Sequence, residues 1–135
     1  MARYLLDSNA LLDLAEVPDA LRKEAREAVE DPQNELFVSL ASLWELAIKA
    51  ARGRLPAYTR LIAQGSEALS HSLQSMNLAV LDISLQQALA AAALPRHHGD
   101  PFDRVMIAQA ILEDMTLITR DRIFSRYAGV RVLAA

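Results

Sequence analysis

Short apolar runs alternate along the chain with longer stretches in which apolar residues recur every three or four positions. The first run, at 4–6 (Tyr-Leu-Leu), is too short for a helix and indicates a strand buried on both faces. Similar runs predict further strands at 35–39, 78–83, 117–119 and 130–133. The chain should therefore contain a sheet of short, mostly buried strands.

Helical periodicity fills the stretches between these runs. We expect helices at 10–15, 19–31, 40–52, 56–74, 84–94, 101–114 and, as a short one, 121–127. Gly53 should end the third of these helices, and Gly65 is a point at which the fourth could divide. The helix at 101–114 is apolar on most of its surface, which predicts a central, buried position. Strands that alternate with helices indicate an α/β fold, a parallel sheet with helices on both faces.

Composition narrows this picture. The 135 residues fit one domain spanning 1–135, and 53% hydrophobic residues with only 5% aromatic ones predict an aliphatic core. The absence of cysteine excludes disulfides and thiolate metal sites, so any metal must have oxygen or imidazole ligands. Neither a signal peptide nor a membrane span is indicated, and we expect a cytoplasmic protein. With 14 Lys and Arg against 17 Asp and Glu, a nucleic-acid partner would require locally concentrated basic residues.

Acidic residues gather at one predicted edge of the sheet. Asp7 ends the first strand, and Glu45 lies in the first turns of the helix after the second strand. Asp103 lies in the first turn of the helix that leads into the fourth strand, and Asp121 follows that strand directly. In a parallel sheet, strand ends and following helix starts meet at the same edge. Clustered carboxylates cannot all ionise without a cation, and magnesium or manganese suits an all-oxygen site.

Each of these acids also has an ordinary explanation. Asp7 and Asp121 could be helix N-caps, and Asp103 could complement a helix dipole. Glu45 could pair with Lys49 one helical turn away. Their convergence on one edge favours the metal site.

Other candidates for chemistry are set aside. The Asp-Pro pair at 100–101 favours a capping role for Asp100 over a ligand role. Asp82 lies within a predicted strand and is interpreted as structural or exposed. His97 and His98 are adjacent in a predicted surface loop, and we expect them to be solvated rather than catalytic, with RNA or a partner as possible contacts.

Sequence segments in the same order along the chain resemble the PIN domain and, more narrowly, the VapC ribonuclease toxins of bacterial toxin–antitoxin pairs: LLDSNALLDL, SLASLWELAIKAARGRL, HHGDPFDRVMIAQA and LITRDRIFSRY. The resemblance covers essentially the whole chain. It implies a three-layer α/β/α fold with a five-stranded parallel sheet in the order 3-2-1-4-5. It also implies metal-dependent endonucleolytic cleavage of RNA, a homodimer, and a VapB-like antitoxin partner.

Residue by residue, the resemblance assigns the family's acidic positions to Asp7, Glu45, Asp103 and Asp121, which would be catalytic and bind the metal. Ser8 and Thr119 match small hydroxyl positions beside them. Many relatives have Thr and His where this chain has Ser8 and Asn9, a departure that leaves all four acids intact.

The implied mechanism needs no side-chain nucleophile. One or two Mg²⁺ or Mn²⁺ ions would activate water and stabilise charge on the leaving oxygen. Basic residues near the same edge could hold RNA phosphates, although each could equally be ordinary surface charge: Lys49, Arg52, Arg54, Arg96, Arg104, Arg120 and Arg122. Two alternatives remain open, a catalytically silent PIN-like binding module and a metal-dependent phosphatase.

Overall fold

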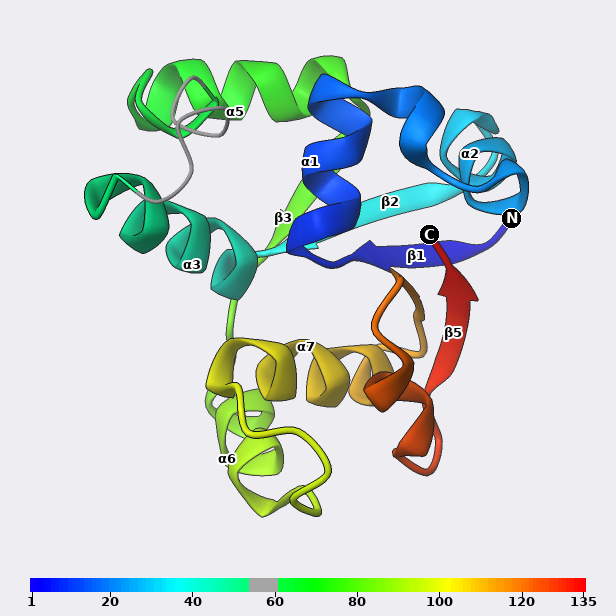
Figure 1. Ribbon diagram of the computed structural model, residues 1–135. Coiled ribbons are helices and arrows are strands. Elements are labelled where there is room, and N and C mark those ends of the chain that lie inside the picture. The colour runs from blue at the N-terminus through cyan, green and yellow to red at the C-terminus, as the bar shows by residue number, and fades with distance from the viewer. Residues whose placement is uncertain (54–60) are drawn as a thin grey trace.

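The computed structural model describes residues 1–53 and 61–135, and within them it contains a five-stranded sheet (Figure 1). The strands follow the order β3-β2-β1-β4-β5, and every neighbouring pair is parallel. They are β1 (Arg3–Leu6), β2 (Glu35–Ser39), β3 (Leu78–Leu81), β4 (Thr116–Thr119) and β5 (Arg131–Ala134). The predicted strands, their parallel pairing and the 3-2-1-4-5 order are confirmed.

Strand β1 is the centre of the sheet. It pairs with β2 on one side and β4 on the other, with Leu6 opposite both Val38 and Ile118. Leu5 and Leu6 are both fully buried, but they belong to different core clusters because successive side chains of a strand point to opposite faces. An apolar run without polar alternation is therefore the pattern that this two-sided burial requires.

Helices cover both faces of the sheet (Figure 1). They are α1 (Ser8–Glu16), α2 (Lys23–Glu30), α3 (Leu40–Ala51), α5 (Ser66–Ser75), α6 (Leu85–Ala93) and α7 (Pro101–Leu112), with short 3-10 helices η1 (Pro18–Ala20) and η2 (Arg122–Arg126). In Figure 1, α1, α2 and α5 lie above the sheet, α3 lies at its left end, and α7 lies below it with α6 packed against α7. The middle of α7 is buried, as predicted, and this arrangement gives the three layers.

Local caps set where the helices start. The side chains of Ser39, Ser84 and Asp100 each accept a hydrogen bond from a backbone N–H in the first turn of α3, α6 and α7, respectively. Ser84 and Gln87 form the reciprocal capping box, with bonds of 3.0 and 3.1 Å. Helices α1 and α3 begin directly at the ends of β1 and β2, which places their first turns at the carboxyl edge of the sheet.

Three predicted elements differ from the structure in their extent, continuity or type. The helix expected at 19–31 is divided into η1 and α2, because the backbone at Leu21 is extended and brings this side chain into the core. Strand β3 ends at Leu81, so Asp82 lies beyond the strand and is exposed. The carbonyl of Asp82 accepts a hydrogen bond from Gln109 Nε2 at 3.2 Å, which connects it to α7 instead of to a neighbouring strand. The helix expected at 121–127 is the 3-10 turn η2.

Two glycines act as helix boundaries. Gly53 has φ +66° directly after the C-cap of α3, a left-handed conformation that only glycine adopts without strain, and α3 ends there as predicted. Gly65 has φ +88° and precedes α5. The helix predicted at 56–74 lies partly outside the described residues. Within the described residues, no helix has the length and apolar character needed to cross a bilayer.

Candidate active site

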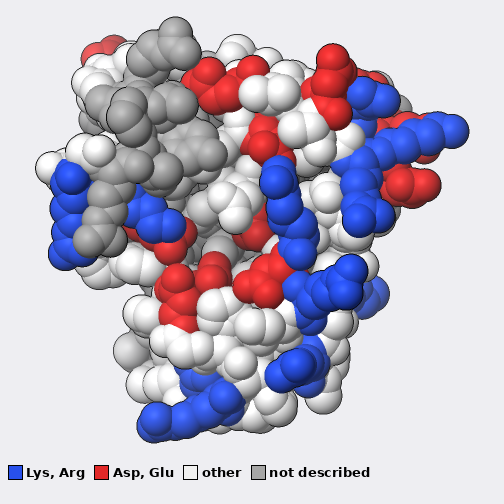
Figure 2. Space-filling view, in the orientation of Figure 1, with Lys and Arg blue, Asp and Glu red and all other residues white. Residues whose placement is uncertain are grey.

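The four predicted acids line one small cleft at the carboxyl edge of the sheet. The cleft has a volume of about 120 Å³ and is lined by Asp7, Ser8, Asn9, Glu45, Lys49, Asp100, Asp103, Asp121 and Phe124. Figure 2 shows acidic side chains (red) gathered across the middle of this face, with basic ones (blue) around them. The structure therefore brings together acids that lie more than a hundred residues apart in sequence, as the parallel architecture predicts.

Asp7 sits where β1 gives way to α1, and it is 5% exposed. Its Oδ1 accepts a hydrogen bond from the N–H of Ala10 at 2.8 Å, so the carboxylate is the N-cap of α1. Its Oδ2 accepts a hydrogen bond from the Thr119 hydroxyl at the end of β4. Asp7 is therefore both the N-cap of α1 and part of the acidic cleft, so the two interpretations of this residue are compatible.

Glu45 is buried in the second turn of α3, with 7% of the residue exposed. The hydroxyl of Ser8 donates to its Oε1 at 2.8 Å, and Lys49 Nζ lies 3.7 Å from its Oε2. The helical pairing considered from the sequence therefore exists, but Glu45 also lines the cleft. Ser8 holds one oxygen of this carboxylate in place.

The carboxylates of Asp103 and Asp121 both contact the side chain of one histidine, His98. Asp103 lies in the first turn of α7, and Asp121 is the N-cap of η2, its Oδ1 accepting from the N–H of Ile123 at 2.9 Å. His98 Nε2 lies 3.1 Å from Asp103 Oδ2 and 3.0 Å from Asp121 Oδ2. The expectation that His98 is solvated was wrong, because its side chain is only 13% exposed.

The neighbouring His97 differs from His98. It is exposed, as predicted, and its ring meets Tyr127 edge-on with the ring centroids 5.0 Å apart. Of these two adjacent histidines, only His98 reaches the carboxylates.

Burial and mutual repulsion penalise negative charge in this cleft. Desolvation raises the pKa of Asp103 to about 8, and the carboxylates of Asp100, Glu45, Asp7 and Asp121 contribute to this rise in that order of importance. Desolvation also raises the pKa of Asp7, opposed by its hydrogen bonds from Thr119 and Ala10. A site with this much unfavourable negative charge is one that a cation stabilises.

The donor set fits a hard divalent cation. The acids in the cleft offer carboxylate oxygens, the ligands that Mg²⁺ and Mn²⁺ prefer. Carboxylate oxygens of Asp103 and Asp121 lie within 4.8 Å of each other, close enough for one ion to contact both. The structure thus supplies the geometry and the charge for a metal centre.

One hydroxyl connects two of the acids. Thr119 is 1% exposed, and its Oγ1 donates to Asp7 Oδ2 while accepting from the N–H of Asp121 at 3.0 Å. It therefore couples the end of β1 to the residue that follows β4. This contact gives a physical basis for the supporting role that the resemblance implies for Thr119.

Replacing Thr119 by the isosteric Val should destabilise the protein. The buried carboxylate of Asp7 and the partly buried N–H of Asp121 would each lose a hydrogen bond, and we expect the free energy of unfolding to fall by about 1–3 kcal/mol in urea titrations. Thr116→Val is the matched control on the same strand, because the hydrogen bond that its hydroxyl accepts, from Arg131 at 3.4 Å, is exposed. A loss at Thr119 no larger than at Thr116 would contradict this account.

The basic residues predicted to contact RNA lie in different surroundings. Lys49 lines the acidic cleft, and Arg52 lines an adjoining pocket with Glu45 and Phe102. Arg120 pairs with Asp13 of α1. Arg104 donates to backbone carbonyls at and after the end of α6, including those of residues 91, 94 and 95.

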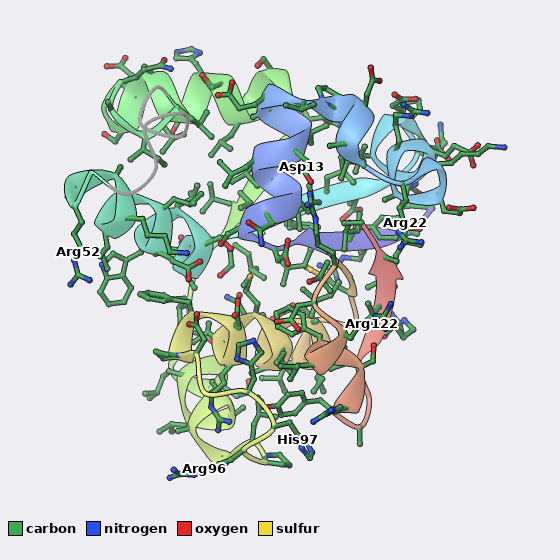
Figure 3. All side chains as sticks on the ribbon, in the orientation of Figure 1. Asp13, Arg22, Arg52, Arg96, His97 and Arg122 are labelled. Carbon is green, nitrogen blue, oxygen red and sulfur yellow. The ribbon has the colours of Figure 1, made fainter. Side chains whose placement is uncertain are left out.

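The other predicted RNA contacts are spread over the surface. Arg96 and Arg122 are exposed, and Figure 3 shows them well apart from each other and from Arg52. Arg54 lies outside the described residues. Among the described basic residues, Lys49 alone lines the acidic cleft itself, and the RNA-binding roles stay predictions.

Two features of the site were missed from the sequence. His98 gives one signal that could have been used: it lies two residues before the capping residue Asp100, in the loop that delivers Asp103. The Asp13–Arg120 pair, with Asp13 labelled on α1 in Figure 3, gives no such local signal. The charge of Arg120 also opposes the rise in the pKa of Asp7, so this pair contributes to the charge balance of the cleft.

An acid-lined cleft at the carboxyl edge of a parallel sheet defines an α/β protein with an acidic cluster suited to a metal ion. Comparison with known proteins is more specific. The chain matches the PIN domain over residues 4–130. It is 31% identical over 123 residues to ribonuclease VapC22 of Mycobacterium tuberculosis, a match that covers 90% of this chain and 89% of that protein. The chain belongs to the PIN domain family, among its VapC-like members.

Solved structures confirm the fold. VapBC2 from Rickettsia felis, bound to a DNA fragment from its promoter, superposes with a TM-score of 0.70 at 19% identity and covers 98% of each chain. A toxin–antitoxin complex from Klebsiella pneumoniae superposes with a TM-score of 0.60 at 27% identity, covering 96% of this chain and 95% of that one.

Proposed function

We propose that this protein is a metal-dependent endoribonuclease and the toxin of a toxin–antitoxin pair. The observation that carries the metal dependence is the cleft in which four acids converge. The choice of RNA as substrate rests on the likeness to VapC22, which is named as a ribonuclease.

In this proposal Asp7, Glu45, Asp103 and Asp121 hold one or two Mg²⁺ or Mn²⁺ ions. A bound divalent cation lowers the pKa of water and stabilises negative charge on a phosphodiester as it is cleaved. The remaining side chains prepare the carboxylates for this task. Ser8 orients Glu45 through a 2.8 Å hydrogen bond, and Thr119 orients Asp7.

Lys49 provides the positive charge nearest to this cluster. Its side chain is about half exposed and its Nζ lies 3.7 Å from Glu45 Oε2, at the wall of the cleft. From this position on α3, its ammonium group can attract a phosphate toward an otherwise acidic surface.

A cleavage assay with the purified chain tests this function against its alternatives. We expect Mn²⁺ or Mg²⁺ to support cleavage of single-stranded RNA, and a chelator to stop it. Hydrolysis of a small phosphate monoester without RNA cleavage would instead identify a phosphatase. Metal-independent RNA binding without cleavage would identify a silent binding module.

We further propose a VapB-like antitoxin partner and a homodimer. Large apolar side chains are exposed on α3 and α6, with Trp44 59%, Leu85 76% and Leu89 63% exposed, which supports burial against another chain. Light scattering of the isolated protein at micromolar concentration should therefore report about twice the chain mass. A monomer under those conditions would contradict the dimer but not the nuclease.

A further inference from the structure

His98 is held on several sides by residues other than the carboxylates. Its backbone N–H donates to the Tyr127 hydroxyl at 2.7 Å, and its ring packs against that of Phe124 with centroids 5.5 Å apart. Its carbonyl accepts a hydrogen bond from Arg104 at 3.2 Å. The ring position is therefore determined by η2 and α7, and Nε2 is directed to Asp103 and Asp121.

The other ring nitrogen decides which atom carries the proton. The backbone N–H of Asp100 donates to His98 Nδ1 at 3.1 Å. Because Nδ1 accepts, its lone pair is in use, and the neutral ring must carry its proton on Nε2. The Nε2–H then donates to the two carboxylate oxygens at 3.0 and 3.1 Å. A nitrogen that carries this proton has no lone pair with which to bind a cation.

We propose that His98 is a positioning residue of the metal site, which donates from Nε2 to Asp103 and Asp121 and holds them for the cation without binding it. This inference rests on the proposed function, since the cation is the one assigned to the acidic cleft. A donor shared by two carboxylates offsets part of their repulsion and fixes the direction of their remaining lone pairs. Outer hydrogen bonds of this kind commonly change metal affinity by about 10- to 100-fold.

Metal binding by three variants separates a positioning role from a packing role. Mn²⁺ affinity can be followed by the EPR signal of free Mn²⁺ during titration. His98→Ala should weaken binding about tenfold or more. His98→Gln should largely restore it, because the amide can donate from nearly the same place. His97→Ala is the matched control on the adjacent histidine and should leave the affinity unchanged.

Two spectroscopic measurements on the unaltered protein test the tautomer directly. At about pH 8, where an ordinary imidazole is neutral, the nitrogen NMR spectrum should show His98 protonated at Nε2 in chelator and with Mg²⁺. Pulsed EPR of the Mn²⁺-loaded protein should show no coupling to a directly bound histidine nitrogen. Neither measurement depends on whether a variant folds.

Several results would overturn the inference. Nitrogen coupling that disappears in His98→Ala would make His98 a metal ligand, and tighter Mn²⁺ binding by that variant would make it a competitor of the cation. Unchanged affinity would reduce it to a packing residue. A proton on Nδ1 of His98 in chelator would contradict the tautomer on which the inference depends, independently of the metal. Failure of the unaltered protein to bind Mn²⁺ at all would instead overturn the proposed metal site, and the positioning role with it.

Discussion

Replacing Asp103 by Asn should reduce RNA cleavage by at least about a hundredfold while leaving the fold intact. A divalent cation contributes several kilocalories per mole to stabilising charge in phosphodiester cleavage, and each ~1.36 kcal/mol corresponds to a factor of ten in rate. Asn keeps the shape of the side chain in the first turn of α7 but lacks the carboxylate charge. Initial cleavage rates at saturating Mn²⁺, with circular dichroism to check folding, measure the effect.

The same substitution at Asp100 is the matched control. Asp100 lies three residues away, caps α7 by accepting from the N–H of Phe102 at 2.9 Å, and also lines the cleft. Asn is as good a cap as Asp, so Asp100→Asn should be much milder. Full cleavage activity in Asp103→Asn, or an equal loss at Asp100, would remove the assignment of Asp103 as a metal ligand.

In chelator, the protein should lose stability as the pH rises from about 4 to about 8. The pKa of Asp103 is about 8 in the folded protein, against an ordinary value of 3.8 in the unfolded chain. The folded state therefore binds more protons than the unfolded state throughout this window, and raising the pH favours unfolding. The slope for one such group approaches about 1.4 kcal/mol per pH unit. The raised pKa of Asp7 acts in the same direction.

Thermal melting across this pH range, in chelator and with Mn²⁺, measures the effect. Asp103→Asn should flatten the slope in chelator, because the group that takes up the proton is gone. Bound Mn²⁺ should stabilise the unaltered protein by about 2.7 kcal/mol at a hundredfold excess over Kd. At a fixed Mn²⁺ concentration, the gain should be largest at the alkaline end, where Asp103 is ionised and the affinity is highest.

Two variants make this result specific. Glu30→Gln, at an exposed position on α2, should leave both the pH slope and the metal response unchanged. Asp7→Asn should melt in chelator at or above the temperature of the unaltered protein and gain much less from Mn²⁺, because one repelling charge and one ligand are lost. A pH-independent melting temperature with no response to Mn²⁺ would show that the acids are ordinary caps.

The amino-acid sequence by itself determined the elements and the place where the acids meet. Two-sided burial requires short apolar runs, and capping requires particular residues beside the helices, so both leave local patterns. Because the strands are parallel, residues that follow β1 and β4 share an edge with the first turns of α3. The order of the residues is therefore enough to group Asp7, Glu45 and Asp121, and these three side chains line one cleft in the folded protein.

Only the tertiary structure decided the surroundings of individual side chains. The sequence around His98 is typical of a solvated loop. The ring is nevertheless largely buried, because Phe124 and Tyr127 pack against this residue. These residues follow it by more than twenty positions, and β4 and η2 lie between them and His98 in the chain or carry them. The Asp13–Arg120 pair joins α1 to the end of β4 in the same way. Such contacts depend on how separate elements pack and on how far a side chain reaches. Neither of these leaves a recognisable pattern in the local sequence.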